Sequence, residues 1–130
     1  MESSSLTLSA LFPANPSTKR ATRVKWSYNP AGQRNLAYFT QKNVVIRNLD
    51  DPKASKVLSQ NILEDISCVK YSPNGNLIAF GNVCGVVKVV GWSNAENNFI
   101  VKYESPLLGA PVNDIAWTDD NQKIIVVGDG

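Results

Sequence analysis

The sequence predicts an all-β protein, and more narrowly an incomplete β-propeller of about two and a half blades. Two observations predict this fold. Short runs of β-branched and aromatic residues, such as 43–47 and 86–90, alternate with clusters of Gly, Pro, Asn and Asp, as in chains of many short strands. One pattern also recurs at the spacing of a four-stranded propeller blade. No stretch has the spacing of an amphipathic helix.

Each copy of the recurring pattern places an aromatic residue before a polar turn and an apolar strand after it. The aromatic residues are Tyr28, Tyr71 and Trp117, which lie 43 and 46 residues apart. These distances bracket the roughly 40 to 45 residue period of a propeller blade. The apolar strands that follow the turns are residues 36–39, 77–80 and 124–127.

The two later copies also share apolar residues five and two positions before the aromatic residue. These offsets suit a strand with a bulge or a bend, after which all three side chains face the inter-blade core. The shared positions are Ile66, Val69 and Tyr71 in the second copy and Val112, Ile115 and Trp117 in the third. The first copy has Arg23, Trp26 and Tyr28 at these positions, and its polar start predicts that blade one is degenerate or an end cap.

The repeat divides the chain into a lead-in segment, residues 1–22, and propeller blades over residues 23–130. The blades are expected at 23–58, 59–108 and 109–130, and the last is incomplete. The third strand of a blade is expected at 45–47 and again at 87–89. Because closed propellers have about four to eight blades, we expect a fragment of a longer protein.

Composition excludes several functional classes. The chain has 130 residues, a net charge of +2, no histidine and two cysteines, so the commonest general base and metal ligand is missing. We therefore expect no enzyme activity, no cofactor and no metal. The weak charge predicts neither nucleic-acid nor membrane binding, and a polar start without a signal-peptide pattern predicts a cytoplasmic protein.

Several stretches resemble one family. The turn at residues 71–75 (YSPNG) is typical of WD repeats, and the start at residues 10–20 (ALFPANPSTKR) resembles that of the actin-interacting protein 1 family. Residues 45–52, 69–75, 109–117 and 126–130 agree with it in order. The resemblance implies two linked propellers, of which this chain is the first part of the first. It also implies a cytoskeletal protein that binds cofilin-decorated actin filaments, promotes their disassembly and blocks regrowth.

The chain departs from the family pattern in blade two. Gly81-Asn82 stands where Gly-Asp is usual, and Val90-Gly91 stands where a Trp-Asp pair is common, with Trp92 displaced by two residues. Without histidine, the polar network that braces many WD blades is missing. We therefore expect blade two to be held mostly by apolar packing.

One basic cluster is the candidate protein-binding site. It comprises Lys19, Arg20, Arg23 and Lys25, next to Trp26, and its charge suits an acidic actin surface. The alternative is a solvated loop and edge strand, where basic residues guard against aggregation.

Three acidic positions are weaker candidates. Asp50 and Asp51 could contact a partner, but the simpler expectation is that their side chains accept backbone N–H groups of their own turn. Asp114 is expected to make a structural hydrogen bond to a neighbouring blade. Gly128-Asp129-Gly130 lacks the spacing, lysine and helix of a phosphate loop. Besides an actin-regulating scaffold, two functions stay open: a WD-repeat adaptor of another multiprotein complex and a propeller-based enzyme.

Overall fold

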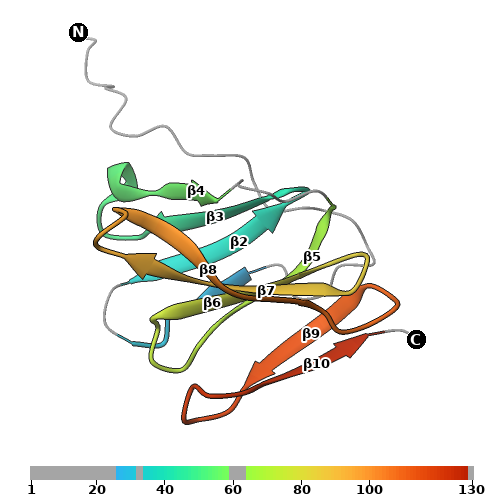
Figure 1. The fold of residues 1–130 in the computed structure, drawn as a ribbon. Helices are drawn as coiled ribbons and strands as arrows, with labels where there is room; N and C mark the ends of the chain where they lie inside the picture. Colours follow the sequence, from blue (N-terminus) through green and yellow to red (C-terminus); the bar gives the residue numbers. More distant parts are fainter. Residues whose placement is uncertain (1–25, 32–33, 59–63, 129–130) are drawn as a thin grey trace, which may run out of the picture.

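A computed structural model describes residues 26–31, 34–58 and 64–128, which form three antiparallel sheets (Figure 1). The first sheet consists of β1 (Trp26–Tyr28), β2 (Asn35–Thr40), β3 (Asn43–Asn48) and β4 (Lys56–Leu58), with the 3₁₀ turn η2 (Pro52–Ala54) before β4. The second consists of β5 (Ile66–Tyr71), β6 (Leu77–Asn82), β7 (Val86–Ser93) and β8 (Asn98–Pro106). The third is the hairpin of β9 (Val112–Trp117) and β10 (Ile124–Gly128). Strands are hydrogen-bonded in chain order within each sheet.

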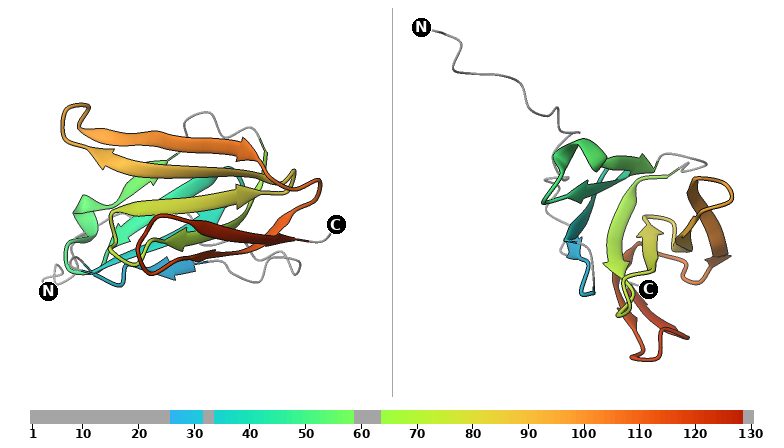
Figure 2. Two further views of the ribbon diagram at one scale, coloured as in Figure 1. Left: turned by 60° about the horizontal axis from the view of Figure 1, so that its bottom comes forward. Right: turned by 90° about the vertical axis from the view of Figure 1, so that its left-hand side faces the viewer.

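The three sheets follow one another in chain order, from the blue-to-green first sheet to the red hairpin (Figure 2). Two apolar cores join them. The first core lies between sheets one and two, where Phe39 and Ile46 meet Val69 and Phe80. The second lies between sheets two and three and includes Ala79. Phe80 and Ala79 belong to different cores because successive side chains of a strand point to opposite faces. Each core is therefore an inter-blade core, and the open stack of sheets is an incomplete propeller. No described helix has the length and apolar character needed to cross a membrane.

The expected bulge is confirmed in both repeats. The pairing of β5 with β6 shifts register between Ile66 and Cys68, and that of β9 with β10 shifts where Val112 is followed by Asp114. Each shift places one extra residue in the first strand of its sheet. As a result, the side chain five positions before the aromatic residue lies on the same face as the aromatic residue and the side chain two positions before it. Ile66, Val69 and Tyr71 are accordingly all buried in the first core.

The turns after Tyr71 and Trp117 repeat in atomic detail. In each turn, the hydroxyl of the first residue donates a hydrogen bond to the side-chain oxygen of the third residue. The same oxygen also accepts the backbone N–H of the fifth residue. Ser72 and Asn74 do this in the second sheet and Thr118 and Asp120 in the third, with hydroxyl-to-oxygen distances of 2.7 Å and 2.6 Å. The next residues, Gly75 and Asn121, both have positive φ, 74° and 62°. The Thr118 hydroxyl and the Gln122 N–H hold the pKa of Asp120 below its ordinary value.

Hydrogen bonds between sheets connect these turns. The side-chain amide of Asn29 donates to the carbonyl oxygen of Gly75 over 3.3 Å. The N–H of Asn74 donates to the side-chain oxygen of Asn121 over 2.8 Å. The turns that follow Tyr28, Tyr71 and Trp117 are thus tied to one another in chain order.

The aromatic residues differ in burial. Tyr71 is 6% exposed, and Trp117 packs partly buried against the second core while its Nε1–H donates to the carbonyl of Lys70 over 3.2 Å. Tyr28 is 44% exposed, so the first copy differs from the two later ones, for which burial was expected. The reason is direction: each aromatic faces the preceding sheet, and no described sheet precedes β1.

Asn82 replaces the usual acidic residue without loss of the turn. Its side-chain oxygen accepts the N–H groups of Cys84 and Val86 at 2.9 Å and 3.0 Å. Ser67 adds a buried polar contact, because its hydroxyl donates to the carbonyl of Val112 over 2.6 Å. Blade two therefore combines apolar packing with short side-chain-to-backbone bonds.

We predict that Gly81→Ala destabilises the full-length protein by about 1 to 3 kcal/mol, because it overpacks a close contact between sheets. A Cβ at Gly81 would lie 2.6 Å from the Cβ of Val112, an atom that side-chain rotation cannot move. Denaturant unfolding measures the change. Gly109→Ala is the control, since a Cβ there meets nothing within 4 Å. Equal stability of the two variants would contradict the close approach.

We predict that Cys68 and Cys84 differ in reactivity. Burial, reinforced by the negative charge of Asp114, raises the pKa of the Cys68 thiol to about 12, whereas the Cys84 side chain is exposed. In native protein a maleimide should modify Cys84 quickly and Cys68 only after unfolding, and peptide mass spectrometry reads each site separately. Because the unfolded thiol ionises at about pH 8.5 to 9, the stability that Cys68 contributes should fall as pH rises from there towards 12. Fast native labelling of Cys68 would contradict its burial.

Candidate protein-binding surface

The predicted basic cluster lies outside the described residues. Lys19, Arg20, Arg23 and Lys25 all precede the first described residue, Trp26. The indole of Trp26 is 59% exposed on β1. The cluster stays a prediction.

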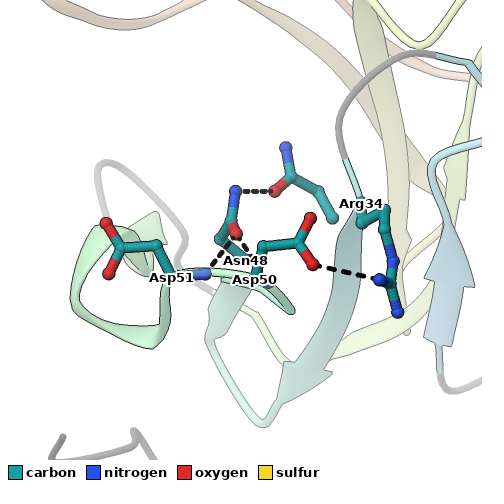
Figure 3. Close-up of polar contacts among 5 residues, drawn as sticks. Arg34, Asn48, Asp50 and Asp51 are labelled. Carbon is teal, nitrogen blue, oxygen red and sulfur yellow. Dashed lines mark hydrogen bonds and ion pairs between the residues drawn. The ribbon is translucent and has the colours of Figure 1, made fainter. Parts of the chain in front are cut away.

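The two acidic residues that follow β3 make different contacts, and Figure 3 shows the ion pair of Asp50 with Arg34. A side-chain oxygen of Asp51 accepts the N–H of Lys53 over 3.2 Å, which is the turn role expected for this residue. The carboxylate of Asp50 pairs with Arg34 at 3.0 Å, with both side chains about 60% exposed. An exposed pair of this kind contributes roughly 0 to 1 kcal/mol.

Asn48 organises the connection from β3 to β4. Its side-chain oxygen accepts the N–H groups of Asp50 and Asp51 at 2.9 Å and 2.7 Å, and its amide donates to Asn35 on β2 at 3.0 Å. The three bonds, drawn in Figure 3, fix the path of the chain as it leaves β3. The chain continues from there through η2 to β4, which starts at Lys56.

Asp114 acts differently from the expectation. Its carboxylate accepts the N–H of Ile115, the next residue on β9, over 2.8 Å. Among the described residues it makes no hydrogen bond to the second sheet, so the expected bond to a neighbouring blade is not made on that side. The negative charge of Asp114 also helps to raise the pKa of the Cys68 thiol, which lies on β5 of the second sheet. Of the phosphate-loop candidate, only Gly128 lies within the described residues.

A groove of about 890 Å³ lies between the first and second sheets. It opens at the ends of β1, β3 and β5, where the turns carry many asparagines. Polar lining comes from the two lysines Lys56 and Lys102 and from Asn29, Asn35, Asn48, Asn74 and Asn76. Apolar lining comes from Ile46, Tyr71, Leu77, Ile78, Trp92 and Phe99, among others. Because these residues come from separate segments of the chain, no sequence motif predicted the groove.

An aromatic pair forms one wall of the groove. Trp92 and Phe99 face each other across β7 and β8, with ring centroids 5.2 Å apart and planes at 80°, an edge-to-face contact. The Nζ of Lys56, from the first sheet, lies 4.8 Å from the Trp92 ring centroid. The displaced Trp92 thus makes a cation–π link between two blades. In the sequence, this aromatic pair is visible only as Trp92 and Phe99 on either side of the polar segment 93–98.

Relatives that cover nearly the whole of this chain carry three names. Actin-interacting protein 1 of Drosophila melanogaster is 30% identical over 120 residues, and WD repeat-containing protein 1 of Gallus gallus is 32% identical over 120 residues. The 66 kDa stress protein of Physarum polycephalum is 31% identical over 126 residues. These matches cover 92% to 97% of this chain and 19% to 20% of the relatives. The chain thus spans about a fifth of the length of these relatives. No family model matches the chain.

A solved structure shows the same fold. A chain in the crystal structure of a mitotic checkpoint complex superposes with a TM-score of 0.59 at 14% identity, over 82% of this chain and 32% of that one. The stacked sheets, the repeated bulge and this likeness define a segment of a WD-repeat β-propeller. Its relatives place it more narrowly. The chain fits a fragment of the actin-interacting protein 1 family, also named WD repeat-containing protein 1.

We predict that Asn48→Ala costs about 1 kcal/mol in the free energy of unfolding, because two backbone N–H groups lose their shared acceptor. Lys53→Ala, in the same connection and exposed, is the control and should leave stability unchanged. Chemical denaturation of both full-length variants measures the difference. An Asn48→Ala protein as stable as the control would show that water replaces the amide without cost.

Proposed function

We propose that the full-length protein containing this chain is a non-enzymatic WD-repeat scaffold that binds actin filaments and promotes their cofilin-dependent disassembly. One observation carries the proposal: a relative that aligns with 92% of the chain is named for interaction with actin. The cofilin part rests on the family resemblance of the sequence. The corresponding location is the cytoplasm, on the actin cytoskeleton.

Propeller architecture supports a scaffold over an enzyme. Each blade contributes turns to the rims, and such surfaces suit large protein partners. Among the described Cys, Asp and Glu residues, no three gather as metal ligands. The acidic residues of the β3–β4 connection are engaged in turn and ion-pair contacts.

The basic cluster of Lys19, Arg20, Arg23 and Lys25 is part of the proposal as an actin-facing surface. Four like charges within seven residues would attract an acidic filament and raise the association rate. This attraction fades as salt shortens the Debye length from about 10 Å at 0.1 M to about 3 Å at 1 M.

We predict that the full-length protein co-sediments weakly with bare actin filaments and more strongly with cofilin-coated ones. Fluorescence microscopy of the same filaments should show faster shortening when both proteins are present. A protein that ignores cofilin-coated filaments would refute the proposal and favour an adaptor of another complex.

Charge reversal tests the basic cluster separately. Replacing Lys19, Arg20, Arg23 and Lys25 by glutamate should slow association mainly at low salt. Reversal of Lys42, Lys53 and Lys123, which are exposed elsewhere, is the control. If both variants match the parent at every salt concentration, the cluster is a solvated segment and not an actin contact.

A further inference from the structure

We propose that the groove between the first two blades binds an extended acidic peptide segment of a partner protein. None of the residues that line the groove belongs to the basic cluster at residues 19–25, and the proposal does not depend on actin binding. A volume of about 890 Å³ falls in the range of roughly 300 to 1,000 Å³ that is usual for ligand sites.

The charge of the groove selects an acidic ligand. Among the described lining residues the only charged ones are Lys56 and Lys102, and none is a carboxylate. The two lysines stand on the outer strands of neighbouring blades, β4 and β8, and both are exposed. Lys102 forms no ion pair with any described residue. A segment with spaced carboxylates would therefore meet one ammonium group from each blade.

Lys56 is held in place before a ligand arrives. Its ammonium group lies over Trp92, and Trp92 is itself fixed by the edge of Phe99 and by a 3.0 Å bond from its Nε1–H to Asn94. A preorganised charge loses little conformational freedom when it binds, so more of the attraction appears as affinity.

The rest of the lining suits a peptide backbone. A side-chain amide can donate to a carbonyl oxygen and accept from an N–H, the two groups that an extended chain presents at every residue. Asn76, on the groove, has a side-chain amide without a hydrogen-bond partner among the described residues. Phe99 and Leu77 add apolar surface for a side chain of the ligand.

The same geometry disfavours single-stranded nucleic acid, the other polyanion of suitable shape. Such ligands are bound largely by stacking of bases on aromatic faces. Here Lys56 lies over the ring of Trp92, and Phe99 meets that ring at 80°. No arginine lines the described part of the groove.

Binding of a labelled peptide to the full-length protein tests the proposal by fluorescence anisotropy. The probe is a short peptide of glutamates with two interspersed leucines, and the comparison probe carries glutamine in place of every glutamate. We expect only the acidic probe to bind. The double variant with Lys56→Glu and Lys102→Glu should weaken binding by about tenfold or more, since each exposed charge contact is modest alone.

Lys42→Glu is the matched control, because this exposed lysine follows β2 and is absent from the groove lining. It should leave affinity unchanged, and thermal melts should show all variants folded. Equal binding of both probes, equal loss with Lys42→Glu, or tighter binding of a poly-uridine strand would each overturn the proposal. Loss of probe binding on reversal of Lys19, Arg20, Arg23 and Lys25, with the groove variant unaffected, would place the acidic ligand on the other surface. Filament co-sedimentation of the groove variant reports on the proposed actin function independently.

Discussion

The contact between the first strand of one blade and the sheet before it organises the described structure. Along β9 this contact is so close that Val112 fills the space where Gly81 lacks a side chain, and the Ser67 hydroxyl bonds the Val112 carbonyl at 2.6 Å. A strand with simple alternation could not offer three apolar side chains at offsets of five, two and zero. The bulge in β5 and in β9 places all three on one face, so one extra residue in each of these strands decides which side chains enter the core.

The repeat made much of this fold predictable. The period, the turn chemistry and the bulge are local properties of the chain, and equivalent residues occur at equivalent offsets in the second and third copies. Tyr28 shows the limit of that reasoning, because its exposure of 44% depends on which sheet lies opposite and not on its own sequence neighbours. The pattern identifies a position in the repeat, while burial depends on the neighbouring repeat.

The groove was unpredictable for a related reason. Its lysines and aromatic residues belong to strands that meet only after the sheets have stacked, and Lys56 lies 36 residues before Trp92. In the sequence, Trp92 could be recognised only as the tryptophan of the Trp-Asp pair of WD repeats, displaced by two residues. In the structure it contacts Phe99 on its own sheet and Lys56 on the preceding sheet, which gives the departure from the family pattern a structural role. The predicted basic cluster could be recognised because its four residues are close together in the chain.

The bonds between successive turns have a consequence for how the blades fold. Asn29 reaches the turn of the second sheet, and the second sheet's Asn74 reaches Asn121 in the third. The turn of one blade therefore lacks part of its hydrogen bonding until the next blade is in place. A single blade is the unit of the sequence repeat, but part of its stability comes from its contacts with the next blade. We therefore expect adjacent blades to unfold together more often than a single blade unfolds alone.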